Sequence, residues 1–565
     1  MVSVTAIVVV MEVGLLLADK LADRTELMTY PLEDGAAYLD EPEEYLKIAI
    51  FGGSSAAGYS SERGFADILE YRLETEFPQV KTFIKNYAQP GYPFHLHQAE
   101  ALKAVIDFYD VFLVYAGHNE ALNYLDDVGV FRTAEAKDQP SLQSISVEKS
   151  EGLWLSLVRF AKSRSRVYAI SRKINEKYVL RQNSGGAGQR AYKYEQFNEI
   201  ESEKAVPEDV VAGIPLAFGR DLREIARAAT AQGKQVIVSS VAVNETYPPF
   251  FSVHRSGITA AERAEFQEIM DLGQEDYDAA RFDDALIHFM AAAEIDNNIS
   301  IVNHRIGQTL MKKGDKERAQ EYLTRGVDED GLPLRSLSVL SQTSKSVSNE
   351  FHNVHFVDSA GSFTKSMKNG LVDNDLFSDI QHPTFLGHII IADGILSKMS
   401  VLEPLDEFSD DTTIQGFDSI NAIVTLMEYM DALAVTPKEQ QDIAFLRSRW
   451  NLGTADITAY PGRFLDAAEE NALLYFQFSS RSDSEKATSL LLRALIEGKR
   501  GQAELAVSLG NEALRLAPTH IKEVLHGSGG LPTRDYWLYA FNDLGIQFLD
   551  EEALLKLGGT RATEN

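Results

Sequence analysis

Four short stretches of this sequence each contain a residue type that acyl-transfer chemistry uses. The stretch IAIFGGSSAAGY runs an apolar segment into a glycine pair and Ser54. NYAQPGY places Gly91 in a turn, AGHNE contains Asn119, and SDIQHPT puts Asp379 three residues before His382. A serine hydroxyl is a weak nucleophile that needs a neighbouring base, which a histidine oriented by a carboxylate can supply. These residue types therefore predict a serine nucleophile.

Each of the five residues has an expected role. Ser54 would attack an ester carbonyl, and His382 would take its proton and return it to the leaving alcohol. Asp379 would fix the imidazole tautomer and stabilise the imidazolium. The backbone N–H groups of Ser54 and Gly91, with the side-chain amide of Asn119, would donate to the oxyanion. Loss of one such donor typically costs about 2.7–4 kcal/mol of barrier.

Strands that alternate with helices must bring these residues together. Five β-rich, largely apolar runs are separated by helical patterns, at 46–53, 81–91, 108–120, 233–244 and 351–361. This alternation predicts an α/β fold, a flavodoxin-like doubly wound parallel sheet of about five strands. Ligands of such sheets bind at the carboxyl ends of the strands. The four stretches occupy those ends or the loops beyond them, so we expect them to meet in one cleft.

The order Ser, Gly, Asn and then Asp-x-x-His resembles the SGNH, or GDSL-type, hydrolase family. FGGSS, AQPG, GHNE and SDIQHPT stand for its first, second, third and fifth blocks, and the resemblance covers roughly 46–120, 215–250 and 350–400. Gly53 replaces the aspartate of the GDSL spelling, and Glu120 replaces the aspartate that often follows the asparagine. Neither departure removes a group that the chemistry needs.

The resemblance implies a serine ester hydrolase that acts through an acyl-enzyme. Its substrate would be an O-acyl or O-acetyl ester of a carbohydrate, a lipid or a small molecule. An O-acetyltransferase is a close alternative, because a sugar hydroxyl could resolve the same acyl-enzyme. A helical-repeat scaffold or adaptor, with the hydrolase fold as support, is the alternative from another class.

The scaffold alternative rests on an internal repeat between the fourth and fifth predicted strands. Two segments match at a shift of 34 residues, with the pairs Leu272/Ile306, Gly273/Gly307, Ala280/Gly314 and Ala285/Ala319. This period resembles the tetratricopeptide repeat, in which small residues let two antiparallel helices approach closely. A third unit near the C-terminus has small residues and a closing proline at Ala494, Gly501, Ala506, Ala513 and Pro518. We expect the inserted pair to dock on the sheet domain or the C-terminal helices, and the repeats to offer a surface to a protein partner.

These patterns divide the chain into parts. An apolar N-terminal segment, 1–24, precedes the first part of the hydrolase domain, 45–258, which contains a basic helical excursion at 150–200. The repeat insert covers 259–345, the second part of the hydrolase domain with Asp-x-x-His covers 346–402, and a helical region covers 415–556.

The N-terminal segment leaves the localisation open. It is apolar from Val2 to Ala18 apart from Ser3, Thr5 and Glu12. That is a little short of the ~20 residues of a spanning helix, and the segment lacks the basic n-region of a signal peptide. It could anchor an extracytoplasmic enzyme to a membrane through residues 2–18, or pack as a buried helix in a protein that could be cytoplasmic. The basic run at 156–181 is either a solvated helix face or an interfacial helix on anionic headgroups.

Composition excludes other chemistries. The 565-residue chain carries a formal net charge of −30, so we expect no nucleic-acid partner. It has no cysteine, which rules out disulfides, thiolate metal sites and a cysteine nucleophile. His95 and His97 have no third convergent ligand, so we expect neither metal nor cofactor. His118 could touch the substrate, whereas we interpret His388 as a packing residue.

Overall fold

The computed structural model describes residues 45–127 and 208–521, apart from 92, 95–97, 255–256, 367–374, 404, 407–421, 456–457, 459 and 479–481. The predicted N-terminal anchor, the basic excursion at 150–200, the His95/His97 pair and residues 522–556 lie outside this part. All described residues belong to one of the two compact units of the chain. Within the described ranges, no helix has both the length and the hydropathy to cross a membrane.

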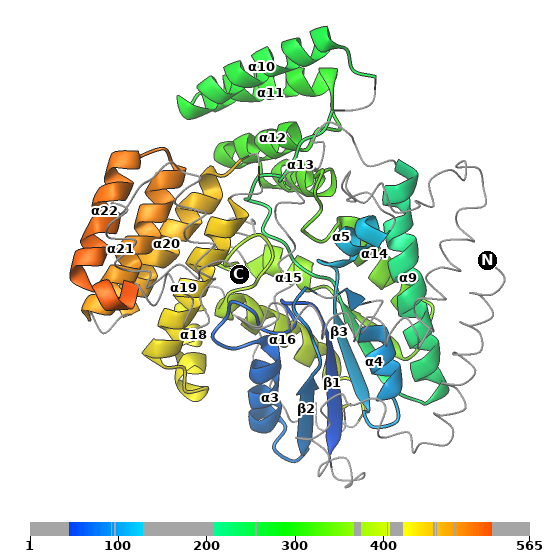
Figure 1. Ribbon diagram of the computed structural model, residues 1–565. Coiled ribbons are helices and arrows are strands. Elements are labelled where there is room, and N and C mark those ends of the chain that lie inside the picture. Colours follow the sequence, from blue (N-terminus) through cyan, green and yellow to red (C-terminus); the bar gives the residue numbers. More distant parts are fainter. Residues whose placement is uncertain are drawn as a thin grey trace, which may run out of the picture. The chain divides into compact units, whose positions relative to one another are not determined.

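A five-stranded sheet lies at the centre of the α/β part of the molecule, as the sequence predicts (Figure 1). All four neighbouring strand pairs are parallel, and the strand order is β2-β1-β3-β4-β5, one that doubly wound sheets use. The strands are shorter than the predicted runs because the runs included residues of the following loop and, except for the first run, of the preceding loop as well. They are β1 (Leu46–Gly52), β2 (Thr82–Asn86), β3 (Val111–Tyr115), β4 (Gln235–Ser239) and β5 (Val354–Val357).

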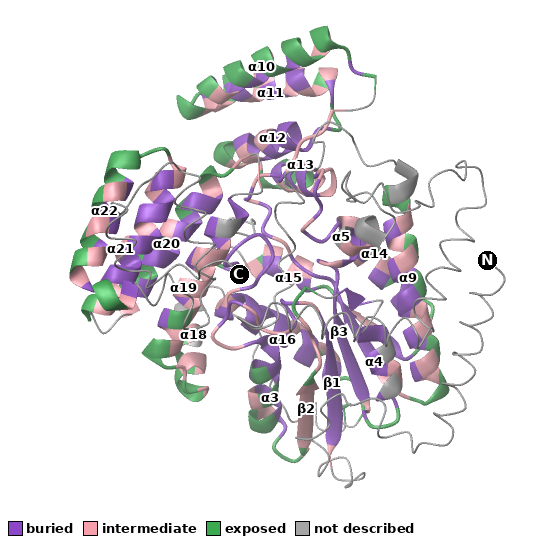
Figure 2. Cartoon of the chain, viewed as in Figure 1, coloured by how far each residue is buried: buried purple, intermediate pink, exposed green. Residues whose placement is uncertain are grey.

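Helices cover both faces of the sheet, which explains why its central strands β1, β3 and β4 are largely apolar. The helices α3 (Phe65–Glu76) and α16 (Phe385–Met399) pack together on one face, while α9 (Glu208–Ala231) and α14 (Ser338–Ser348) pack on β4 from the other. Every residue of β1 and β3 is buried (Figure 2).

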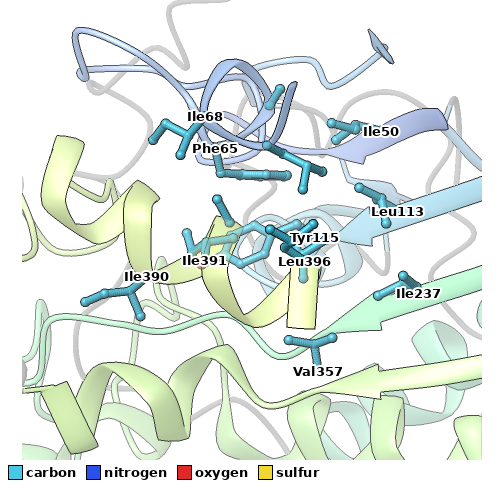
Figure 3. Close-up of a cluster of buried hydrophobic side chains, with 14 of the residues drawn as sticks. Ile50, Phe65, Ile68, Leu113, Tyr115, Ile237, Val357, Ile390, Ile391 and Leu396 are labelled. Carbon is cyan, nitrogen blue, oxygen red and sulfur yellow. The ribbon is translucent and has the colours of Figure 1, made fainter. Parts of the chain in front are cut away.

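The largest described core lies under α3 and α16 (Figure 3). Alternate strand residues, Ile48 and Ile50 on β1 and Leu113 and Tyr115 on β3, face this side because side chains along a strand alternate between its two faces. The helices contribute Phe65, Ile68, Leu69, Ile390, Ile391 and Leu396. Burial of this core fixes the strand ends that carry the candidate site.

Shorter helices complete this region. They are α4 (Ala99–Ala104), α5 (Glu120–Asp127), α15 (Ser359–Ser366) and α18 (Ala422–Ala432).

The segment between β4 and α14 forms two helical hairpins. Its helices are α10 (Ala260–Asp278), α11 (Phe282–Ile295), α12 (Ser300–Lys313) and α13 (Lys316–Asp328), each packed on the next. A Cβ atom placed on Gly273 would lie 2.7 Å from the Phe289 ring, and one on Gly307 would lie 2.6 Å from Leu323. Both glycines therefore permit the same close approach of two helices, 34 residues apart.

A third hairpin, near the C-terminus, repeats this geometry. It joins α21 (Asp483–Lys499) to α22 (Ala503–Leu516). The turn residues Ala280, Gly314 and Gly501 have φ angles of 56°, 82° and 80°. Five residues after each turn stands a fully buried alanine, and these are Ala285, Ala319 and Ala506. The small residues of the three units thus occupy equivalent places.

One matched pair has two different environments. Leu272 on α10 is 44% exposed, whereas Ile306 on α12 is fully buried. The difference arises because α12 packs between α11 and α13, while α10 packs on α11. The sequence match therefore predicts the shared hairpin geometry, but it does not predict that Leu272 and Ile306 differ in burial.

The insert contacts the rest of the described fold on two sides. On α13, Gln320 and Thr324 donate hydrogen bonds to the Glu245 carboxylate in the loop after β4. Tyr460 packs against the hydrophobic core of the insert. It precedes α20 (Gly462–Phe478), which pairs with α19 (Pro437–Thr454). The insert thus contacts both a sheet loop and the C-terminal helical region.

Candidate active site

The end of β1 fixes where Ser54 stands. A Cβ atom on Gly52 would lie 2.1 Å from the Tyr115 carbonyl oxygen on β3 and 2.5 Å from the Ala56 Cβ atom, so only glycine fits. The buried Gln98 side chain binds both backbone polar groups of Gly52. Its Nε2 donates to the Gly52 oxygen and its Oε1 accepts from the Gly52 N–H, both at 2.5 Å. The glycine pair is therefore part of the support for Ser54.

The Asp-x-x-His stretch is a turn that its own aspartate closes. Asp379 Oδ1 accepts hydrogen bonds from the backbone N–H groups of Gln381 and His382, both at 2.8 Å. This leaves Oδ2 to accept from the imidazole. Thr384, not Asp379, caps α16, because its hydroxyl accepts from the Gly387 N–H. The three-residue spacing thus follows from local geometry.

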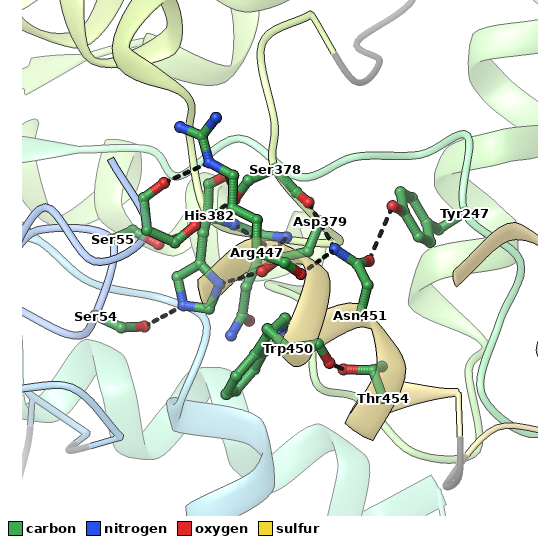
Figure 4. A network of polar contacts seen from close by, with 12 residues as sticks. Ser54, Ser55, Tyr247, Ser378, Asp379, His382, Arg447, Trp450, Asn451 and Thr454 are labelled. Atoms are coloured by element: carbon green, nitrogen blue, oxygen red, sulfur yellow. Dashed lines mark hydrogen bonds and ion pairs between the residues drawn. The ribbon is translucent and has the colours of Figure 1, made fainter. Parts of the chain in front are cut away.

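The serine, the histidine and the aspartate meet in one line (Figure 4). Ser54 Oγ lies 2.7 Å from His382 Nε2, and His382 Nδ1 lies 2.6 Å from Asp379 Oδ2. Ser54 is 7% exposed, and the other two are each 1% exposed. With Nδ1–H donating to the carboxylate, Nε2 is free to accept the serine proton.

The neighbouring serine has a different function in the structure. Ser55 Oγ donates a hydrogen bond to the Gln381 carbonyl oxygen at 3.0 Å, and the residue is buried. This bond ties the serine loop to the histidine loop. The geometry thus distinguishes Ser54 from Ser55, which the sequence could separate only by counting from Gly52.

The predicted oxyanion donors lie at the same edge of the sheet. Gly91 follows β2 and Asn119 follows β3, and these two strands are the neighbours of β1. The Gln89 N–H donates to the Gly52 oxygen at 3.0 Å, which holds the loop of Gly91 against the end of β1. Gly91 has a φ of 76° and is exposed, and Asn119 is half-buried. The structure joins Ser54, His382 and Asp379 directly, and shows the shared edge for Gly91 and Asn119.

Two further histidines near the site are held neutral. His118 Nδ1 accepts from the Ser336 N–H at 3.3 Å, and burial together with the nearby His382 lowers the pKa of His118 to about 3. His388 Nδ1 accepts from the Phe65 N–H at 3.2 Å in the core, where burial lowers its pKa to about 3. With so low a pKa, His118 is too weak a base to compete with His382 for the serine proton. His388 is a buried residue of α16.

The site has supporting residues that the sequence analysis missed. Gln98 is one, and the others lie on α19, where Trp450, Arg447 and Asn451 contact the two site loops. No periodicity or local motif marks these positions, because their contacts join segments far apart in the chain. In the described part, no three His, Asp or Glu side chains are grouped so that they could hold a metal ion.

Comparison with known proteins adds no assignment. No protein-family model matches this chain, and no curated protein matches it. The site is therefore interpreted from its own geometry.

Proposed function

We propose that this chain is a serine ester hydrolase of the SGNH type, acting on an O-acyl or O-acetyl ester through an acyl-enzyme on Ser54. The observation that carries the proposal is the unbroken line of hydrogen bonds from Ser54 Oγ through His382 to Asp379 Oδ2. The position of Ser54 just beyond a central strand, in a sheet of order 2-1-3-4-5, supports the SGNH fold. The 34-residue recurrence of the hairpins supports a tetratricopeptide-like insert.

The reaction follows from the positions of the groups. Ser54 Oγ attacks the carbonyl carbon while its proton passes to His382 Nε2. Asp379 stabilises the imidazolium, and the N–H groups of Ser54 and Gly91 with the Asn119 amide stabilise the oxyanion. Collapse breaks the ester C–O bond, and His382 protonates the leaving alcohol. Water, deprotonated by His382, then attacks the acyl carbon. The bond from that carbon to Ser54 Oγ breaks, the acid leaves, and His382 returns the proton to Ser54 Oγ.

Burial of the three side chains supports an enzyme over a scaffold. Burying polar or ionisable groups costs free energy that hydrogen bonds offset only in part. A purely structural turn would need neither the Ser54 hydroxyl nor the His382 imidazole at this place. A catalytic role explains why the fold keeps these three groups buried in spite of that free-energy cost.

Labelling with a fluorophosphonate tests the proposal, because these probes react with activated serines. The full chain is compared with Ser54→Ala and with the matched control Ser55→Ala, whose lost hydroxyl holds only the Gln381 carbonyl. We expect the parent and Ser55→Ala to label and Ser54→Ala to remain unlabelled. Equal labelling of parent and Ser54→Ala would refute the nucleophile, and no labelling of the parent would favour the scaffold.

Turnover of short p-nitrophenyl esters, from acetyl to octanoyl, then defines the acyl group. A steep preference for acetyl would identify an O-acetyl ester as substrate. Release of the acyl group to water in the presence of a sugar alcohol supports the hydrolase, and transfer to the sugar would identify the acetyltransferase instead.

A further inference from the structure

A helix from the C-terminal region forms one side of the candidate site. On α19, Arg447, Trp450 and Asn451 stand at positions i, i+3 and i+4, which lie on one face of a helix. In Figure 4 the three residues come from the same helix and approach the loops around His382. No strand of the described sheet contributes this face.

Two of these residues tie together the loops that carry the site. Arg447 Nε donates to the Ser60 carbonyl oxygen at 2.8 Å, in the loop that begins with Ser54. Asn451 Nδ2 donates to the Ser378 carbonyl oxygen at 3.0 Å, one residue before Asp379. The nucleophile and the base are 328 residues apart in the chain. A helix bonded to both loops therefore restrains the distance between them.

Trp450 contacts the base itself. Its ring lies edge-on to the His382 imidazole, with 5.3 Å between centroids and an angle of 86°. Tyr59 packs against the same imidazole at 5.0 Å and contacts Trp450 at 5.8 Å. The imidazole turns about its Cβ–Cγ bond, and such a turn would carry Nδ1 and Nε2 away from their hydrogen-bond partners. The two aromatic rings packed on the imidazole oppose that turn.

Stability alone does not account for a tryptophan at this position. Trp450 Nε1 is buried without a hydrogen-bond partner in the described part of the protein. A buried unpaired N–H lowers stability, so a ring without a donor would pack at less cost. The contact with His382 offers a reason for the aromatic ring that packing stability does not.

We propose, on the basis of the proposed hydrolase function, that Trp450 is a positioning residue for His382 and that docking of α19 is a condition for proton transfer from Ser54. The candidate site is then complete only with a residue from the C-terminal helical region. Trp450 takes no part in bond making or breaking.

The test separates positioning from folding by measuring two quantities in the full chain. The final extent of fluorophosphonate labelling counts intact sites, and the first-order rate constant reports how well His382 activates Ser54. Trp450→Leu keeps an apolar side chain but removes the ring, and Trp450→Phe restores a ring. The matched control is Phe445→Ala on the same helix, because the Phe445 ring packs on Tyr475 at 5.6 Å and away from the site.

We expect Trp450→Leu to reach the same final extent as the parent at a rate at least about tenfold lower, because small displacements of a base have large effects. Trp450→Phe should return to within about threefold of the parent rate. Phe445→Ala should label at the parent rate even if its melting temperature falls.

Two results would overturn the inference while leaving the hydrolase in place. The first is labelling of Trp450→Leu at the parent rate. The second is an equal slowing by Phe445→Ala, which would show that the Trp450 ring has no positioning role of its own. A parent chain that does not label at all would instead refute the hydrolase, and this inference with it.

Discussion

At the scale of single residues, Gly52 shows how a strand end can determine the position of a nucleophile two residues later. Its α-hydrogens face the Tyr115 carbonyl oxygen and the Ala56 methyl group. The Gln98 side chain hydrogen-bonds both the N–H and the carbonyl oxygen of Gly52. Any side chain at position 52 would push β1 away from β3. Ser54 would then move relative to His382.

Gly52→Ala should therefore damage both stability and activity. The clash is with backbone, so we expect a loss of about 3 kcal/mol or more in the free energy of unfolding, together with reduced ester turnover. Gly233→Ala is the matched control, because Gly233 has a φ of 65° and open space around its Cβ position. The control should cost about 1–2 kcal/mol and leave turnover unchanged. Urea unfolding and ester assays measure both, and equal effects of the two changes would contradict this interpretation.

Asp379→Asn tests the tautomer of the base. The asparagine oxygen can still accept from the Gln381 and His382 N–H groups, so the turn should persist. Its amide would then donate to Nδ1, which forces the proton to Nε2 and blocks acceptance from Ser54. We expect turnover to fall by roughly 10⁴-fold with little change in melting temperature. Turnover within about tenfold of the parent would contradict the assigned role.

The residues of the site differ in how far the sequence predicts them. Ser54, Asp379 and His382 could be found because each belongs to a local turn whose spacing is visible in the chain. Gln98 and Trp450 could not, because their contacts join segments that no local pattern relates. The choice between Ser54 and Ser55 needed the bond from Ser55 to Gln381.

At the scale of elements, the three helical hairpins turn at residues with the same left-handed backbone. Gly314 and Gly501 adopt it without strain, whereas Ala280, with a φ of 56°, carries a Cβ atom in a region that disfavours it. The turn of the first hairpin therefore carries a small backbone strain at Ala280, which glycine avoids in the turn of the second hairpin.

Exchanging the two residue types should have opposite effects. Ala280→Gly should stabilise the insert by about 0.5–1 kcal/mol, and Gly314→Ala should destabilise it by about 1–2 kcal/mol. Hydrogen exchange of the α10–α13 amides in the full chain measures both, because it reports local opening. Slower exchange after Gly314→Ala would contradict the shared turn geometry.

The strands could be predicted from the sequence, whereas the burial of individual helix residues could not. The alternation of apolar runs and helical patterns correctly predicts five parallel strands, because strands covered by helices on both faces are mostly apolar. The different burial of Leu272 and Ile306 was not visible, since it depends on which helices lie beside each one.

At the scale of the whole molecule, regions that the sequence separates share buried contacts. The Tyr247 hydroxyl, in the loop after β4, donates to Asn451 on α19, and the Tyr247 ring packs on Phe464 at 4.7 Å. Arg335, between α13 and α14, is buried and donates to the Asn244 and Tyr247 carbonyl oxygens. Local sequence patterns divide the chain into parts but do not predict these buried contacts between the parts.

Buried neutral histidines should make the molecule sensitive to acid. The pKa values of His118 and His388 are lowered to about 3, against about 6.5 for an unfolded histidine. Between these values the unfolded chain binds more protons, so stability is full above pH ~6.5 and is lost as the pH falls. Each histidine contributes a slope of up to about 1.4 kcal/mol per pH unit.

His388→Gln isolates one of these slopes, because a glutamine oxygen can still accept from the Phe65 N–H. Burial raises the pKa values of Glu245 and Asp330, which acts in the opposite direction, so the difference between variant and parent is the quantity to measure. Between pH 7 and pH 4, the free energy of unfolding should fall less steeply with decreasing pH in the variant than in the parent. The two slopes should differ by up to about 1.4 kcal/mol per pH unit, which corresponds to one proton. Parallel curves would mean that His388 does not stay neutral in the fold.

The central claim is that the Ser54 hydroxyl is activated by His382, and locating the fluorophosphonate adduct tests it most directly. Tandem mass spectrometry of the peptide that spans the glycine pair distinguishes Ser54 from Ser55. We predict one adduct per chain, on Ser54, that disappears in His382→Ala while the protein remains folded. An adduct on Ser55, or one on Ser54 that forms at the parent rate without His382, would contradict the account.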